Sequence, residues 1–152
     1  MRALVLLYVV ACGAGTSQSA TTPPQLMHSP ELNHIMKSEV NQPFSALEFM
    51  VFHAEGGDLD YTAIGGPAEM LRAGIARVRA IVDPPVQTNE ARSVFFTFVE
   101  NLARDADRFS QAVARRDRAG MESSLNRISE TCNNCHHFFR LSIADSPQRS
   151  LP

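Results

Sequence analysis

The feature that most constrains this chain is the sequence Cys132-Asn133-Asn134-Cys135-His136. Positions i, i+3 and i+4 of a helix share one face, so a helix here would project both thiols and the imidazole from the same side. The Cys-x-x-Cys-His spacing is the attachment signature of a c-type haem, in which two thiols add across the porphyrin vinyl groups and the histidine supplies the proximal iron ligand. We therefore predict one covalent haem c, bound through Cys132, Cys135 and His136.

Two other kinds of site use a Cys-x-x-Cys pair, the redox dithiol and the zinc site. A structural zinc site needs further well-placed ligands, and the only other cysteine is Cys12, at the far end of the sequence. A thioredoxin-like dithiol belongs to a βαβ context, and no strand pattern surrounds residues 132–136. Haem attachment is therefore the favoured interpretation.

The same helical stripe stays apolar on both sides of the motif. It comprises Met121, Leu125, Ile128, Phe139 and Ile143. A helix with such a stripe packs along its length against an apolar partner. A haem, which is a flat apolar object, suits that position.

Residues 1–11, MRALVLLYVVA, predict an export signal with Arg2 as its positive region. The apolar run from Ala3 to Val10 is too short to span a bilayer. The segment around Cys12 is similar to a bacterial lipobox, in which that cysteine is lipidated; the alternative is an ordinary cleavable signal in which it has no role. Both forms predict a periplasmic location, where bacterial c-type haem is attached, and membrane contact only through a lipid anchor at Cys12.

Residues 12–28 predict a flexible tether, because Gly, Ser, Thr and Pro dominate them. The whole chain has 14 Lys+Arg against 16 Asp+Glu, so its charge does not indicate a nucleic-acid partner. Its 152 residues suffice for one folded domain. We place that domain at residues 29–145, with a polar tail at 146–152.

The folded part has four segments with helical spacing of apolar residues and no strand pattern. The first segment begins at Ser29, as the N-cap, with Pro30 in its first turn. Pro43 interrupts it, and we expect a kink there. The segment ends at the glycine-rich residues 55–58.

A loop that runs to Gly65 and Gly66 precedes the second helix, which Pro67 opens. The expected apolar stripe of this helix is Met70, Leu71, Ile75, Val78 and Val82. The third helix begins at Thr88, and its solvated face carries Arg92, Glu100, Asp107 and Arg115. A tight connection at residues 117–120 leads to the last helix. Together these segments predict an all-α fold, an antiparallel four-helix bundle with haem attached to its last helix.

This pattern resembles the class II cytochromes c, the cytochrome c′ family. The likeness rests on the motif in the last helix, on the block 117–125 before it, and on Phe139 and Arg140, which follow His136 by three and four positions. It covers about residues 29–143, strongly in the last helix and by pattern alone in the middle two. The resemblance gives Arg140 a role in cofactor binding, at a propionate or at the proximal edge; the alternative is a plain surface arginine.

In this family the first helix packs on the distal side of the haem, with a bulky apolar residue over the iron in five-coordinate members and a methionine in low-spin members. The segment 34–38, HIMKS, is similar to the low-spin type. The resemblance therefore implies His136 and Met36 as the iron ligands. A thioether is a soft, neutral ligand that suits haem iron. By spacing alone, Met36 also suits a core position, because methionine commonly fills gaps in bundles.

The remaining histidines and aromatic residues have less specific expectations. His34 lies about 200° round a helix from Met36, so both side chains cannot face one iron. The surface is expected to hold His28, His53 and His137. Phe139 is expected near the proximal ligand. Two residues of the third helix are candidate haem walls or ordinary core residues, namely Phe95 and Phe98.

The leading functional hypothesis is a periplasmic carrier of single electrons, since both axial positions of its iron would be filled. Such a protein docks weakly with redox partner proteins, and the resemblance adds a homodimer as an expectation. The alternative is a five-coordinate protein that binds nitric oxide or carbon monoxide, which follows if Met36 does not ligate. No acid–base constellation near the motif indicates an enzyme.

Overall fold

The computed structural model describes residues 29–54, 59–81, 84, 86 and 88–139. This part of the chain is almost entirely helical and contains no β-strand, so the predicted all-α class is confirmed. The helices are α1 (Pro30–His34), the π-helix η1 (Ile35–Asn41), α2 (Gln42–Phe52), α3 (Tyr61–Arg79), α4 (Asn89–Ala114) and α5 (Arg118–Phe139). None of the helices within these ranges is both long and apolar enough to cross a bilayer. The expectations for residues 1–28, 55–58, 82–83 and 140–152 fall outside the described residues.

The helices α1, η1 and α2 follow one another without a break. The Ser29 hydroxyl accepts a hydrogen bond from the Leu32 amide at 3.2 Å, and Pro30 occupies the first turn, as predicted. Pro43 has no N–H to donate to the Glu39 carbonyl, its partner in an α-helical pattern. The expected interruption takes the form of a π-helical stretch that ends immediately before α2. Such stretches often occur at functional sites.

The segment η1 is held tightly against α3. A Cβ atom placed on Gly74 would overlap the Glu39 carbonyl oxygen, so the two backbones approach as closely as only glycine allows. The Glu39 carboxylate also pairs with the Arg77 guanidinium on the same side. These contacts hold one face of η1 against α3.

The predicted start of the second helix is wrong, because α3 begins at Tyr61 and includes Gly65, Gly66 and Pro67. The Asp60 carboxylate accepts hydrogen bonds from the amides of Thr62 and Ala63, both at 3.0 Å, and so caps the helix earlier. Ile64 is 1% exposed. Capping and burial oppose the cost of an interior proline, which is about 3 kcal/mol.

The predicted stripe of this helix is correct only in part. Leu71, Ile75 and Val78 are buried, whereas Met70 is 56% exposed. Met70 neighbours Leu71 in sequence, and adjacent residues point about 100° apart on a helix. Only one of the two can face the core, and the structure selects Leu71.

The connection between α4 and α5 is shorter than predicted. Helix α4 begins after Thr88, whose hydroxyl accepts a hydrogen bond from the Ala91 amide at 3.1 Å, in agreement with the prediction. Arg116 has a φ of 53°, and this residue reverses the chain. The Asp117 carboxylate then accepts a hydrogen bond from the Gly120 amide at 2.9 Å. The last helix therefore starts at Arg118, and Gly120 belongs to it rather than to the turn.

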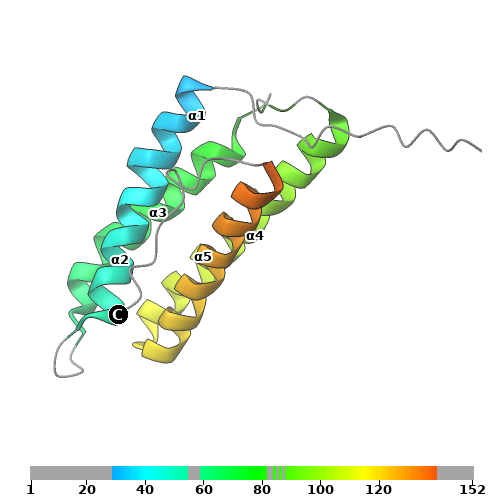
Figure 1. The fold of residues 1–152 in the computed structure, drawn as a ribbon. Coiled ribbons are helices and arrows are strands. Elements are labelled where there is room, and N and C mark those ends of the chain that lie inside the picture. Colours follow the sequence, from blue (N-terminus) through cyan, green and yellow to red (C-terminus); the bar gives the residue numbers. More distant parts are fainter. Residues whose placement is uncertain (1–28, 55–58, 82–83, 85, 87, 140–152) are drawn as a thin grey trace, which may run out of the picture.

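Successive long helical segments run in opposite directions, and α4 and α5 lie side by side with the most extensive contact (Figure 1). Further contacts join α3 to α4, to η1 and to α2, and join α2 to α5. The Arg118 guanidinium donates a hydrogen bond to the Val51 carbonyl at 3.1 Å, which ties the end of α2 to the start of α5. From this junction the α1–η1–α2 segment and α5 diverge toward α1 in Figure 1.

Candidate functional site

The motif occupies the last two turns of α5, and its residues share one helix face. Cys132 is 6% exposed and belongs to the core, while Cys135 and His136 are half-buried. The stripe that leads to them is buried as predicted, with Met121, Leu125 and Ile128 at 0% exposure and Phe139 at 1%. Both thiols and an imidazole therefore project from a single, largely apolar side of α5.

The two cysteines are free thiols. Burial, followed by the negative charges of Cys135 and Glu48, raises the pKa of Cys132 to about 12. Burial also raises the pKa of Cys135 to about 12. A catalytic redox dithiol needs a thiol with a lowered pKa, because the thiolate is the nucleophile. The electrostatics of this pair therefore oppose the dithiol interpretation.

The zinc interpretation needs further ligands beside the thiols. Among the described residues no group of three or more His, Cys, Asp or Glu side chains is arranged to hold a metal ion. An iron held by a porphyrin does not need such a group, because the porphyrin nitrogens supply the equatorial ligands.

Aromatic side chains of α4 and α5 meet beside the motif. The ring centroids of Phe95 and Phe139 are 6.3 Å apart, and those of Phe98 and Phe138 are 6.2 Å apart. Phe138 and Phe139 are themselves in edge contact at 4.9 Å. Phe95 and Phe98, the two predicted haem walls or core residues, thus pack against Phe139 and Phe138, three and two positions after His136.

Met36 lies in η1, half-buried and packed against the core. Both η1 and the end of α5 that carries the motif lie on the α1 side of the junction between Val51 and Arg118 (Figure 1).

The other histidines among the described residues, His34, His53 and His137, are all exposed. His34 is exposed, so of the pair His34 and Met36 only the methionine points toward the core. The predicted surface positions of His53 and His137 are confirmed, and the His53 ring stacks on Phe49 at 5.2 Å. Arg140 and His28 lie outside the described residues, as does Cys12.

Sequence reasoning missed two polar residues of η1 and α2. The Asn41 Oδ1 atom is buried and has no hydrogen-bond partner among the described residues. The negative charge of Glu48 contributes to the raised pKa of the Cys132 thiol. The two residues are seven positions apart and so share a helix face. A polar pair at this spacing beside the apolar residues Phe44 and Val51 was the available signal.

Asp105 is another buried polar residue that the sequence did not reveal. It is 5% exposed and accepts hydrogen bonds from Arg127 at 2.9 Å and Arg108 at 2.8 Å. Since Arg127 belongs to α5, this ion pair links α4 to α5. Asp105 directly precedes Ala106 in the α4 stripe, and its position there indicates a structural role in the contact.

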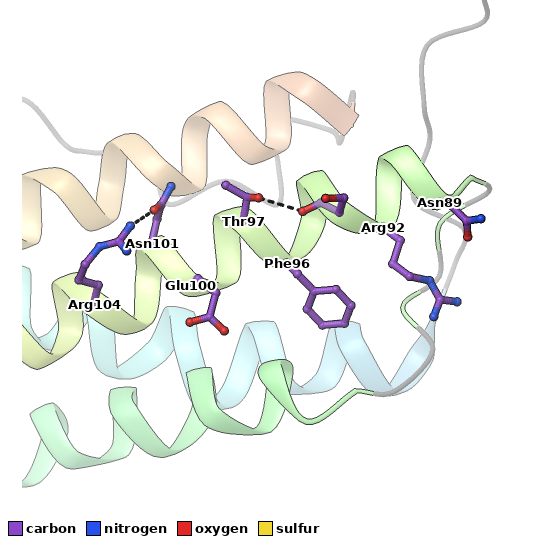
Figure 2. A pocket seen from close by; sticks show the side chains of 8 residues that line it. Asn89, Arg92, Phe96, Thr97, Glu100, Asn101 and Arg104 are labelled. Atoms are coloured by element: carbon purple, nitrogen blue, oxygen red, sulfur yellow. Dashed lines mark hydrogen bonds between the residues drawn. The ribbon is translucent and has the colours of Figure 1, made fainter.

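A shallow groove runs along a different face of α4 (Figure 2). It is lined by Asn89, Arg92, Ser93, Phe96, Thr97, Glu100, Asn101 and Arg104. All of these residues come from one helix, and the Glu100 carboxylate pairs with Arg79 at 2.7 Å. The groove is therefore the space between side chains of the polar face predicted for this helix, and it holds none of the predicted site residues.

Comparisons of this chain with protein-family models, with curated proteins and with solved structures found no match. Conclusions about its function therefore depend on the residues and the geometry described above.

Proposed function

We propose that this chain is a mono-haem c-type cytochrome that carries single electrons in the periplasm. The observation that carries the proposal is the placement of Cys132, Cys135 and His136 on one buried-to-half-buried face of a long helix. The donor set has the chemistry that a c-type haem requires, namely two thiols three positions apart followed by an imidazole. When bound, the haem supplies a one-electron iron couple.

Each residue of the site has a defined part in this proposal. Cys132 and Cys135 hold the porphyrin through thioether bonds, and His136 is the proximal ligand. Met36, on η1, would be the other iron ligand supplied by the protein, and a neutral thioether favours reduced iron. The aromatic residues of α4 and α5 exclude water from one side. With His136 and Met36 both bound to the iron, no ligand position would remain for a substrate.

The proposed architecture is an antiparallel four-helix bundle in which α1, η1 and α2 together form the first helix. The alternating directions of the segments in Figure 1 support it. Export through residues 1–11, a lipid anchor at Cys12 and cofactor binding by Arg140 complete the proposal. Redox partners would dock near the end of α5, where Phe138 is 38% exposed.

A second candidate is a five-coordinate protein that binds nitric oxide or carbon monoxide. The observation that favours it is the packing of Met36 against the core, because an apolar wall over the iron would need the same contact. The two candidates differ only in whether the Met36 sulfur reaches the iron.

The test is expression of the full chain in a periplasm that attaches c-type haem, followed by mass spectrometry and visible spectra. We expect a covalent haem mass and, in the reduced protein, a sharp low-spin α band that carbon monoxide does not move. Cys132→Ser with Cys135→Ser should lose the covalent haem, and Met36→Leu should give a high-spin spectrum that carbon monoxide shifts. A wild-type chain without haem mass would refute the proposal. A high-spin wild-type spectrum would favour the second candidate.

A further inference from the structure

The buried residues of the α1–η1–α2 segment are spaced as a π-helix requires. They form a stripe that comprises Leu32, Ile35, Val40, Phe44, Leu47 and Val51. Neighbours in this stripe are three or four positions apart, except Ile35 and Val40, which are five apart. Residues five apart point about 140° from each other on an α-helix, whereas the i→i+5 hydrogen bonds of a π-helix bring them nearly into line. The π-helix η1 therefore keeps Ile35 and Val40, both 2% exposed, on one buried face.

The same register decides on which side of the stripe Met36 lies. Met36 precedes Val40 by four residues. On an α-helix it would lie about 40° from Val40, on the side that carries Glu39. Because more than four residues make one turn of a π-helix, Met36 falls instead on the other side of Val40. Glu39 faces α3, where its backbone meets Gly74 and its carboxylate pairs with Arg77. The half-buried side chain of Met36 is therefore turned away from α3.

Two residues favour the π-helix at this point, one in the segment and one in α3. Pro43 has no N–H to donate to the Glu39 carbonyl, so an α-helical turn here would gain no hydrogen bond at that position. The Gln42 amide donates to the Lys37 carbonyl, five residues before it. The Glu39 carbonyl oxygen lies against Gly74, in space that a Cβ atom on that residue would fill. Pro43 thus removes the α-helical partner of this carbonyl, and Gly74 provides room for it.

We propose that Pro43 and Gly74 are positioning residues, which together hold η1 in its π-helical register and so direct Met36 away from α3. This inference rests on the proposed function, in which Met36 is an iron ligand. Apart from α3, the segment makes its main helix contact with α5, through α2, and α5 carries the motif. The register therefore decides whether the thioether can reach the iron, and with it which of the two candidate functions the chain has.

The experiment records visible spectra of the haem-loaded full chain as wild type, Pro43→Ala, Gly74→Ala and Gly65→Ala. Pro43→Ala restores an amide that can donate to the Glu39 carbonyl, and Gly74→Ala fills the space for that carbonyl. Each should raise the ratio of high-spin to low-spin haem at least about fivefold, which corresponds to about 1 kcal/mol, the lower end of overpacking costs and the worth of one hydrogen bond. Carbon monoxide binding should rise in parallel.

Gly65→Ala is the matched control in α3, because nothing lies within 4 Å of its added Cβ, and it should leave the ratio within about twofold of the wild type. Covalent haem mass and far-ultraviolet circular dichroism identify the variants that are loaded and folded, so that a spectral change reports ligation. If one of the two test variants fails to fold, the other decides. Wild-type spectra in Pro43→Ala and Gly74→Ala, or an equal change in Gly65→Ala, would overturn the inference.

A wild type that lacks haem or is high-spin would instead be a failure of the proposed electron carrier. The register is then tested in the haem-free full chain that carries Met36→Cys, by the rate at which iodoacetamide alkylates the thiol at position 36, resolved by peptide mass spectrometry. Addition of Pro43→Ala or Gly74→Ala should slow this reaction relative to addition of Gly65→Ala, because position 36 turns toward α3. Equal or faster alkylation would end the inference.

Discussion

Helix α5 contacts α4 on one side and the α1–η1–α2 segment on the other, and the two contacts differ in kind. Against α4 the contact is the most extensive in the described structure, and the buried Asp105–Arg127 pair crosses it. Against α2 it depends on the junction of Val51 and Arg118, beyond which the two segments diverge (Figure 1). The contact between α4 and α5 extends along both helices, whereas the contact between α2 and α5 is made near the start of α5.

The difference shows where the fold is complete by itself and where it is not. Between α4 and α5, apolar stripes meet and the buried charge has partners, so nothing further is required. The first segment carries half-buried Met36 and the Asn41 oxygen, which has no partner among the described residues, and α5 carries half-buried Cys135 and His136. Under the proposed function, a flat apolar cofactor with polar edges would lie among these groups. The predictions below test that contrast in the haem-free full chain, from the largest effect to the smallest.

Phe109→Ala should lower the free energy of unfolding by disrupting the packing on the α4 side of α5. Phe109 is 1% exposed in α4, and truncation of such a side chain costs about 3–5 kcal/mol through lost burial and a cavity. Urea denaturation of the variant measures the loss. Phe49→Ala is the matched control, because Phe49 is 67% exposed and its truncation should cost less than about 0.5 kcal/mol. Similar losses for both variants would mean that the α4 side is not the closely packed one.

Alkaline pH should destabilise the thiol side. The unfolded chain releases its thiol protons above about pH 9, whereas burial keeps the folded pKa values of Cys132 and Cys135 at about 12. The free energy of unfolding is therefore unaffected well below pH 9 and falls as the pH rises toward 12, by roughly 3 kcal/mol at pH 10 for the two thiols together. Denaturation at several pH values measures this. The variant Cys132→Ala/Cys135→Ala should lose this part of the pH dependence, and an unchanged pH profile in it would exclude the thiols as the cause.

Gly74→Ala should loosen η1 from α3, because the added Cβ overlaps the Glu39 carbonyl oxygen. Overpacking of this kind costs typically about 1–3 kcal/mol. Gly65→Ala in the same helix is the control. Nothing lies within 4 Å of its added Cβ, and alanine is the better helix former, so this variant should gain about 0.5–1 kcal/mol. Thermal melts of both variants should move in opposite directions, and a shared direction would contradict the close approach.

Asn41→Leu should stabilise the haem-free chain by about 1 kcal/mol, since it removes a buried acceptor without a partner. The exposed Asn33→Leu is the control and should change stability by less than about 0.5 kcal/mol. Urea denaturation measures the stability of both variants. A loss of stability in Asn41→Leu would show that the Asn41 oxygen has a hydrogen-bond partner in solution.

Helix starts with a local cause were predicted correctly from the sequence. Ser29 and Thr88 both cap helices through hydroxyl groups, as expected. The start of α3 was wrong because Pro67 is a strong local signal, and the burial of Ile64 that outweighs it depends on residues distant in the sequence. The burial of Asp105 was also missed, because its partner Arg127 lies on another helix.

The sequence by itself determined the all-α class, the buried stripe of α5 and the shared face of Cys132, Cys135 and His136. These follow from helical periodicity, which acts within a few residues. Only the tertiary structure decided that Met36 packs against the core and that the Asn41 Oδ1 atom is buried without a partner among the described residues. Each of these depends on how α2 and η1 are set against α3 and α5, and that register is fixed by contacts such as Gly74 with Glu39 and Arg118 with Val51. Such contacts join residues far apart in the chain, and no local pattern encodes them.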